Sequence, residues 1–230
     1  MKKKINIGII IYGRTTSTRL INKIFKKING ETLLELVYLR TKKGASNIPI
    51  IINTTKLKSD DKIVFYCKKN KINYFRGNLK NVFNRTVQCC KKFSFDAFVR
   101  VNADRPFFDY NLMKKMIKIF LNNNYDIVTN QMPNFCSKGL ACEVASSKIF
   151  YRLNQKNLKK NEKEHIFNYF YENRNQYKIL NLVDKFYKSN KNFNLSLDTK
   201  LDLKRTKRIY NYYNNYSYVL PKTVLKKFKQ

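Results

Sequence analysis

The sequence predicts an α/β fold with a largely parallel sheet and helices on both faces. Strand-like runs alternate with amphipathic helical runs, and this is the order of a parallel sheet with crossover helices. Residues 5–12 and 48–54 are apolar at most positions, as in strands that are buried on both faces. A chain of 230 residues is long enough to bury a sizeable core. We therefore expect a single domain over residues 1–230.

Further strands are predicted where shorter apolar runs occur. Residues 97–102 (AFVRVN) and 125–130 (YDIVTN) are two such runs, and residues 72–75 (INYF) are a weaker one. The stretch 178–197 is expected to contain late strands. In a sheet of this kind the ligand lies beyond the carboxyl ends of the strands, so the residues that follow each strand are the candidates for function.

The segments between these runs have helical patterns. Residues 31–42, for example, carry a stripe of apolar residues at helical spacing. Near residues 131–150 the pattern loosens, and we expect a small substrate or dimerisation subregion at about 131–185. The helices are predicted at residues 31–42, 59–70, 111–123, 162–173 and 200–215.

The charge of the chain is strongly positive, with 48 lysine and arginine residues, 15 acidic residues and a formal net charge of +33. Such a charge suggests nucleic-acid binding. However, most of the basic residues are lysines spread through nearly every segment, and no helix-turn-helix, RNP or zinc signature occurs. We expect no specific nucleic-acid partner, and a positive field that attracts polyanions such as nucleoside triphosphates.

The composition also argues against three other classes. No apolar run approaches the length of about 18 residues that a membrane-spanning helix needs, so no membrane insertion is expected. The five cysteines include no CxxC pair and the chain has one histidine, so neither a zinc site nor a disulfide framework is indicated. Free buried thiols in a reducing cytoplasm are the simpler interpretation.

A basic loop rich in hydroxyl groups follows the first predicted strand. Residues 13–19 read GRTTSTR, and Lys23 comes four residues later. At a helix N-terminus such a loop offers backbone N–H groups to an anion, and a glycine permits close approach. Read alone, the loop could equally be an ordinary turn with this chain's usual basic residues. The candidate phosphate ligands are Gly13, Arg14, Ser17, Arg19 and Lys23.

Two aspartates follow later apolar runs. Asp104 stands in NADRP after the run at 97–102, and Asp198 stands in SLDT. Mg²⁺ is typically bound through one or two carboxylates together with substrate phosphates, so both are candidate metal ligands. Alternatively, Asp104 caps the helix near residue 110 or pairs with Arg105, and Asp198 is a helix N-cap.

These pieces, in this order, resemble a family of cytidylyltransferases related to spore-coat polysaccharide protein F and, more distantly, to CMP-sialic acid and CMP-KDO synthetases. The resemblance covers about residues 5–215. The family's opening A-R-x-x-S-T-R-L-P-G-K stands at 13–23 as GRTTSTRLINK, and V-R-x-x-G-D-x-P stands at 99–106 as VRVNADRP. Matches to G-x-P-L-L-E, T-x-x-x-x-D-D, R-G-x-x-x-x-V-L-x-R, G-L-D-x-E-V, R-E-H and L-D-T-x-x-D lie at residues 30–35, 55–61, 76–85, 139–144, 163–165 and 197–202.

The resemblance implies a Rossmann-like nucleotide-diphospho-sugar transferase fold. It implies transfer of CMP from CTP to an acidic sugar or related acceptor, with release of pyrophosphate, in surface polysaccharide or glycoconjugate biosynthesis. It also implies a Mg²⁺ cofactor and a homodimer. The implied catalytic residues are Arg14, Lys23 and Asp104, the metal ligands Asp104 and Asp198, the nucleotide-binding residues Gly13, Arg14, Ser17, Arg19, Lys23 and Arg76, and the acceptor-binding residues Arg85, Glu143 and His165.

Some of these assignments stay open. Arg76 and Arg85 could exchange roles between nucleotide and acceptor, and His165 could lie at a surface or subunit contact. The chain also departs from the family's pattern, because Ile21-Asn22 replaces Pro-Gly, Asn81 replaces an acid and Ala141 replaces Asp. An alternative is therefore a catalytically degenerate member that binds nucleotide or serves as a scaffolding subunit.

Overall fold

The architecture comes from a computed structural model that describes residues 5–132 and 136–228. Its strands are β1 (Ile7–Tyr12), β2 (Lys27–Ile28), β3 (Glu31–Thr32), β4 (Ile50–Thr55), β5 (Asn73–Gly77), β6 (Ala97–Asn102), β7 (Ile127–Thr129), β8 (Glu143–Ser146) and β9 (Ile179–Asn181). Its α-helices are α1 (Leu33–Ala45), α2 (Asp61–Lys69), α3 (Val82–Lys92), α4 (Tyr110–Asn122), α5 (Ser147–Arg152), α6 (Lys160–Glu164), α7 (Asn168–Glu172), α8 (Lys185–Ser189), α9 (Lys200–Tyr212) and α10 (Pro221–Phe228). Short 3-10 helices lie at Lys23–Phe25, Lys58–Asp60, Gln155–Asn157 and Arg174–Gln176.

The central sheet has seven strands in the order β5-β4-β1-β6-β8-β7-β9. Of these seven, only β8 runs against the others, since it pairs antiparallel with both β6 and β7. The mostly parallel mixed sheet predicted from the sequence is therefore confirmed. In the β6–β8 register Arg100 lies opposite Glu143, so the first residue of β8 is near the carboxyl end of β6.

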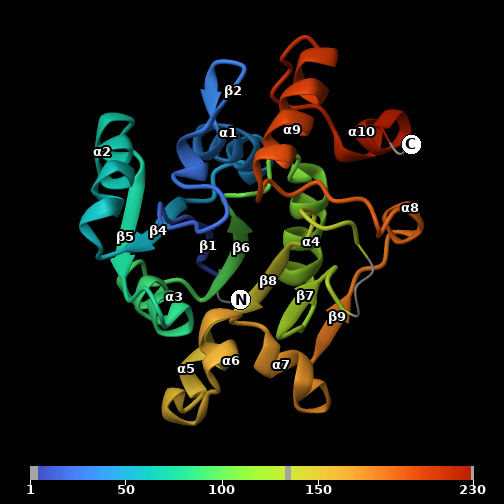
Figure 1. Cartoon of the computed structure of the whole chain (residues 1–230). Helices are drawn as coiled ribbons and strands as arrows, with labels where there is room; N and C mark the ends of the chain where they lie inside the picture. Colours follow the sequence, from blue (N-terminus) through green and yellow to red (C-terminus); the bar gives the residue numbers. More distant parts are fainter. Residues whose placement is uncertain (1–4, 133–135, 229–230) are drawn as a thin grey trace.

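Alternate residues of the strands build two cores, one on each face of the sheet. Ile9 and Val99 pack with α1, α4, α9 and α10 in one core, whereas Ile10 and Phe98 pack with α3 and α5 in the other. Figure 1 shows α5 and α6 next to α3 at the lower end of the molecule, and α9 at the end toward which the β6 arrow points. The predicted helices on both faces are confirmed.

The hairpin of β2 and β3 leads directly into α1. Its turn residues Asn29 and Gly30 both have positive φ, 51° and 103°, which suits the asparagine-glycine pair of a tight hairpin turn. Thr32 then caps α1, accepting a hydrogen bond from Glu35 N, while the Glu35 carboxylate accepts one from Thr32 N.

The structure differs from the predicted elements at the carboxyl-terminal half. The helix predicted at 162–173 is broken into α6 and α7 at His165, whose φ of −99° and ψ of 81° are not helical. Of the late strands expected at 178–197, only β9 forms part of a sheet. Strand β8 was not predicted, because its four residues follow an irregular segment and show no pattern of their own.

Within residues 5–132 and 136–228, no helix combines the length and apolar character needed to cross a membrane. All five cysteines are free thiols.

Candidate active site

Two adjoining cavities lie at the carboxyl ends of the central strands. The first, of about 370 Å³, is enclosed by the loop after β1, the end of β6 and the segment before α9. The second, of about 680 Å³, lies on the β8 side. Arg100, Asn102 and His165 line both cavities, so these residues form the wall between them.

Most of the predicted site residues meet in the first cavity, although they come from distant parts of the chain. Glu143 lines the second cavity, and His165 lines both. The sequence predictions found in the first cavity are Gly13, Arg14, Ser17, Arg19, Lys23, Arg85, Asp104, His165 and Asp198.

Lys23 joins the two predicted metal ligands. Its Nζ donates to Asp104 Oδ2 at 2.9 Å and to Asp198 Oδ1 at 2.8 Å. Two further cations approach Asp198, namely Arg19 at 3.2 Å and Lys138 at 3.2 Å. The two carboxylates therefore face one small volume, although they stand 94 residues apart in the chain.

The charged side chains of this cluster stabilise one another's ionised forms. Burial alone would make ionisation of Asp198 harder, but hydrogen bonds from Lys23 and Lys138 outweigh it and lower the pKa of Asp198 to about 2. Burial likewise opposes the protonated form of Lys23, yet the charge of Asp104 and the hydrogen bonds to both carboxylates raise the Lys23 pKa. At neutral pH the cluster thus contains an ammonium ion between carboxylates.

Neither aspartate has the purely structural role left open by the sequence. Helix α4 is capped by Asp109, which accepts hydrogen bonds from Asn111 N and Leu112 N. Helix α9 is capped by Thr199. The side chains of Asp104 and Asp198 instead face the cations of the cavity.

The loop after β1 is held by a buried carboxylate, Asp60. Asp60 Oδ1 accepts from Thr15 N at 2.8 Å and from Thr15 Oγ1 at 2.6 Å. Its Oδ2 accepts from Thr54 Oγ1 at 2.9 Å and from Thr55 N at 3.1 Å. One side chain therefore ties the basic loop to the end of β4. Asp60 stands in one of the sequence motifs, but no role was predicted for it. Its hydrogen bonds to Thr15 join residues 45 positions apart, and the sequence pattern does not show such a contact.

The two arginines whose roles were left open lie in different places. Arg85 is buried against the first cavity, with Nη1 donating to Asn78 O at 2.8 Å, and burial lowers the pKa of its guanidinium. The structure does not bring Arg76 into the site. On the edge strand β5, its guanidinium donates to Thr55 O and Leu57 O and pairs with Asp61 at 2.7 Å. These contacts hold Arg76 on the edge strand, where it lines neither cavity, and Arg85 lines the cavity of the basic loop rather than the second cavity. The roles predicted for the two arginines stay predictions.

The second cavity contains one carboxylate and several cations. Glu143 pairs across the strands with Arg100 Nη1 at 3.2 Å, and the ring of Phe167 lies beneath the Arg100 guanidinium. The sequence did not single out Arg100 or Arg105 as site residues, although both stand in the motif that contains Asp104. The cations that line this cavity are Arg100, Arg105, Lys138 and Lys191.

The structure accommodates the departures from the family's pattern. Asn22 has φ 52° and ψ 32°, a left-handed conformation that glycine adopts readily and asparagine tolerates. Asn81 caps α3, because its side chain accepts from Asn84 N at 2.8 Å. Ile21 is 71% exposed, and Ala141 is buried at the wall of the second cavity. Asn22 therefore tolerates the backbone conformation at its position, and Asn81 has a structural role as a helix cap.

A basic loop and paired carboxylates at the carboxyl edge of a parallel sheet, with a second cavity beside them, define a nucleotidyltransferase type of site. The chain belongs to the cytidylyltransferase family, whose model matches residues 8–223.

Similar proteins agree with this membership. The chain is 33% identical over 195 residues to an uncharacterized protein of Methanocaldococcus jannaschii, covering 85% of this chain and 79% of that protein. It is 24% identical over 214 residues to a spore coat polysaccharide biosynthesis protein of Bacillus subtilis, covering 89% and 86%. A 3-deoxy-manno-octulosonate cytidylyltransferase of Fusobacterium nucleatum is 32% identical over 122 residues, covering 50% of this chain and 46% of that protein.

Two solved structures show the same fold. A cytidylyltransferase from Leptospira borgpetersenii superposes with a TM-score of 0.89 at 28% identity, covering 97% of this chain and 95% of that one. A CMP:2-keto-3-deoxy-manno-octonic acid synthetase in complex with CTP superposes with a TM-score of 0.67 at 11% identity, covering 90% and 99%. The expected fold of the nucleotidyltransferases is therefore confirmed.

Proposed function

We propose that this protein transfers CMP from CTP to an acidic sugar or related acceptor and releases pyrophosphate. The observation that carries the proposal is the arrangement of Lys23 between Asp104 and Asp198, beneath a basic loop and beside a separate cavity. Two relatives, one named for spore coat polysaccharide biosynthesis and one named 3-deoxy-manno-octulosonate cytidylyltransferase, support a role in surface polysaccharide or glycoconjugate synthesis.

The first cavity is the proposed nucleotide site. Residues of the loop at 13–19 line the space that a triphosphate would fill, and Arg14, Arg19 and Lys23 supply positive charge there. In the transfer, the acceptor oxygen forms a bond to the α-phosphorus as the bond from that phosphorus to the pyrophosphate oxygen breaks. Cations placed at the loop stabilise the charge that develops on the leaving pyrophosphate.

Asp104 and Asp198 are the proposed ligands of Mg²⁺. Their oxygens lie within 3 Å of the Lys23 ammonium nitrogen, so both carboxylates converge on one point of the cavity. The described residues contain no group of three or more His, Cys, Asp or Glu side chains that could hold a metal. Two carboxylates completed by substrate phosphates match the usual preference of Mg²⁺. When bound, Mg²⁺ neutralises phosphate charge and makes the α-phosphorus more electrophilic.

The decisive experiment measures nucleotide binding and turnover separately. We expect CTP to bind in a calorimetric titration with Mg²⁺, and pyrophosphate to be released when an acidic sugar is added. Asp104→Asn should lower turnover by about 100-fold or more, and by more than Asp198→Asn, because Arg19, Lys23 and Lys138 already surround Asp198.

The matched control is Asp61→Asn, which changes an exposed carboxylate outside both cavities. If CTP does not bind and Asp104→Asn behaves like Asp61→Asn, the proposed function is wrong. CTP binding without turnover over a broad panel of acceptors would instead favour a nucleotide-binding subunit.

The proposal places the enzyme in the cytoplasm. Five free thiols, four of them buried, suit a reducing compartment.

A homodimer stays a prediction, and light scattering on the purified protein measures the oligomeric state directly.

A further inference from the structure

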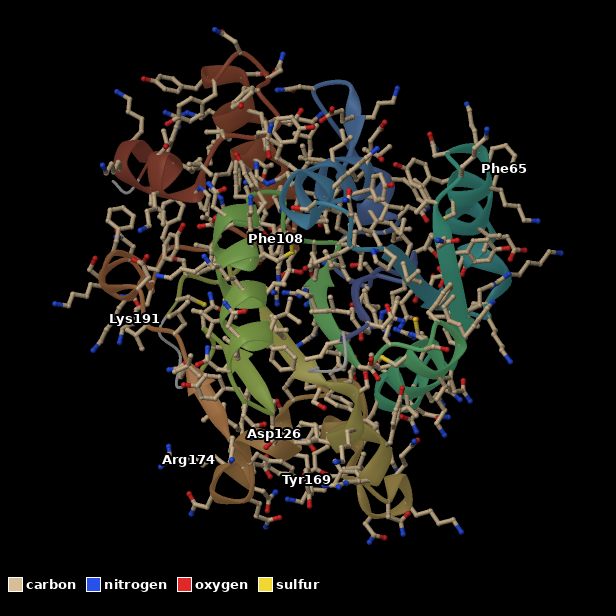
Figure 2. All side chains as sticks on the ribbon, turned by 180° about the vertical axis from the view of Figure 1, so that it is seen from behind. Phe65, Phe108, Asp126, Tyr169, Arg174 and Lys191 are labelled. Atoms are coloured by element: carbon tan, nitrogen blue, oxygen red, sulfur yellow. The ribbon has the colours of Figure 1, made fainter. Side chains whose placement is uncertain are left out.

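The second cavity contains two cations that no carboxylate neutralises. Arg100 pairs with Glu143 and Lys138 pairs with Asp198. By contrast, neither Arg105 nor Lys191 has a carboxylate oxygen within 4.0 Å among the described residues. Both line the cavity, and Figure 2 shows Lys191 at the side of the molecule near α8 and β9. Two unneutralised positive charges at one cavity favour an anionic ligand.

Arg105 is held in place for such a ligand. It directly follows Asp104 in the chain, is 8% exposed and donates through Nη1 to Ala141 O. This hydrogen bond occupies one of the five N–H groups of the guanidinium. A buried guanidinium without an anionic partner is costly, so a ligand anion at this position would relieve the cost. Arg105 is buried, whereas Lys191 is exposed.

Glu143 supplies the complementary group. It is 1% exposed, and its Oε1 accepts from Arg100. Its Oε2 is buried and has no hydrogen-bond partner among the residues that the structure describes. A buried carboxylate oxygen without a donor is unfavourable, and a ligand hydroxyl in the cavity would satisfy it.

We propose that Arg105 and Lys191 form an anion subsite for the acceptor, and that Glu143 Oε2 accepts a hydrogen bond from a hydroxyl of the same molecule. The subsite rests on the proposed function, because it lies beside the nucleotide cavity and shares its wall. The acceptor is then a polyhydroxylated molecule with a carboxylate or a phosphate. The subsite also keeps the two negatively charged substrates apart. The anionic group of the acceptor lies on the β8 side, and the triphosphate lies on the β1 side.

The test is an equilibrium titration of paired probes. Protein saturated with Mg²⁺ and a non-hydrolysable CTP analogue is titrated with eight- and nine-carbon keto sugar acids, with hexuronates and with hexose phosphates. Each probe is compared with its neutral carboxamide or unphosphorylated sugar. We expect at least one acid to bind about 10- to 100-fold more tightly than its neutral counterpart, as charge-assisted hydrogen bonds imply. The acid and phosphate arms distinguish the two kinds of anion.

The variants then assign the preference to residues. Arg105→Gln and Lys191→Gln should each reduce the preference for the acid by about tenfold. Lys191 is exposed, so Lys191→Gln keeps the test valid even if Arg105→Gln disturbs folding. The matched control is Lys114→Gln, an exposed lysine on α4 that lines neither cavity. Equal binding of acidic and neutral probes, or a preference unchanged in both variants, would overturn the subsite.

The outcome is separable from that of the proposed function. Failure of CTP itself to bind would count against the proposed function. Normal CTP binding together with no acid preference would remove the anion subsite alone.

Discussion

Lys23 connects three parts of the fold through a single nitrogen atom. It comes from the segment after the basic loop, while Asp104 follows β6 and Asp198 precedes α9. An ammonium ion at this point keeps two carboxylates close without mutual repulsion. In the proposed function its charge also contacts the triphosphate, so the same residue would organise the free site and bind the nucleotide.

Replacing this cation should weaken nucleotide binding. We expect Lys23→Met to raise the Kd for CTP with Mg²⁺ by about 10- to 100-fold, because charge-assisted hydrogen bonds to phosphate are lost and two carboxylates face the site unscreened. Calorimetric titration measures the Kd. Lys27→Met on the exposed hairpin is the control, and a Kd equal in the two variants would contradict this role.

Asp60 offers a stability test with a neighbouring control. Asp60→Asn leaves one acceptor oxygen for several buried donors, so we expect the free energy of unfolding to fall by about 2–4 kcal/mol. Asp61→Asn removes only a half-exposed pair with Arg76 and should cost at most about 1 kcal/mol. Urea denaturation of both variants measures the free energy of unfolding. Equal losses in the two variants would show that Asp60 does not hold the basic loop.

At the scale of elements, backbone hydrogen bonds set the spacing of the site. Leu197 N donates to Asp104 O at 2.9 Å, and Leu195 N donates to Lys138 O at 2.7 Å. The segment before α9 is thereby fixed against both the end of β6 and the chain that enters β8. These contacts place Asp198 beside Asp104 independently of the side-chain ion pairs.

Gly139 makes this packing possible. It has φ 97°, and a Cβ there would lie 2.5 Å from Ser196 N and 2.6 Å from the carbonyl carbon of Leu195. Gly139→Ala should therefore cost well over 3 kcal/mol and displace Asp198. Gly30→Ala meets no atom within 4 Å, so only the strain of its φ of 103° remains, about 1–3 kcal/mol. Thermal unfolding measures the loss of stability in both variants, and equal losses would contradict the packing role of Gly139.

Elements with regular patterns were predictable, and those defined by long-range contacts were not. The runs around β1, β4 and β6 are strongly apolar, so the sequence located both the strands and the residues at their carboxyl ends, including Asp104. Strand β8 has only four residues and owes its place to pairing with β6 and β7. Arg76 looked like a ligand because its motif adjoins Arg85, yet its contacts lie on the edge strand.

At the scale of the whole molecule, the net charge of +33 makes buried carboxylates important for stability. Arg40 shows how the fold manages a buried cation, since it donates to Phe108 O and to Ser217 O and so joins α1 to the carboxyl-terminal segment. Figure 2 shows Phe108 well inside the molecule. Protonating the few acids would leave the positive charges to repel one another.

The fold should consequently lose stability in acid. Burial opposes ionisation of Asp60 and Asp184, but hydrogen bonds from the threonines and from Lys222 respectively lower the pKa of each below the usual value of 3.8. Since the unfolded chain binds these protons more tightly, the stabilisation is complete above about pH 4 and is lost as pH falls further.

Urea midpoints measured between pH 5 and pH 2 should fall steadily below about pH 4, and Asp60→Asn should flatten the decline. A midpoint that is constant over this range would contradict the assignment.

The reversed direction of β8 has a consequence for how this fold can be altered. Its amino end, not its carboxyl end, reaches the edge where the neighbouring strands finish, so the chain entering β8 forms much of the wall of the second cavity. That stretch joins none of the strands β1, β4 and β6. The stretch also carries Lys138, which pairs with Asp198, so the wall of the second cavity is coupled to the carboxylate cluster of the first. Replacing the stretch that enters β8 should therefore alter both cavities at once, because its residues contact Asp198 and the segment before α9.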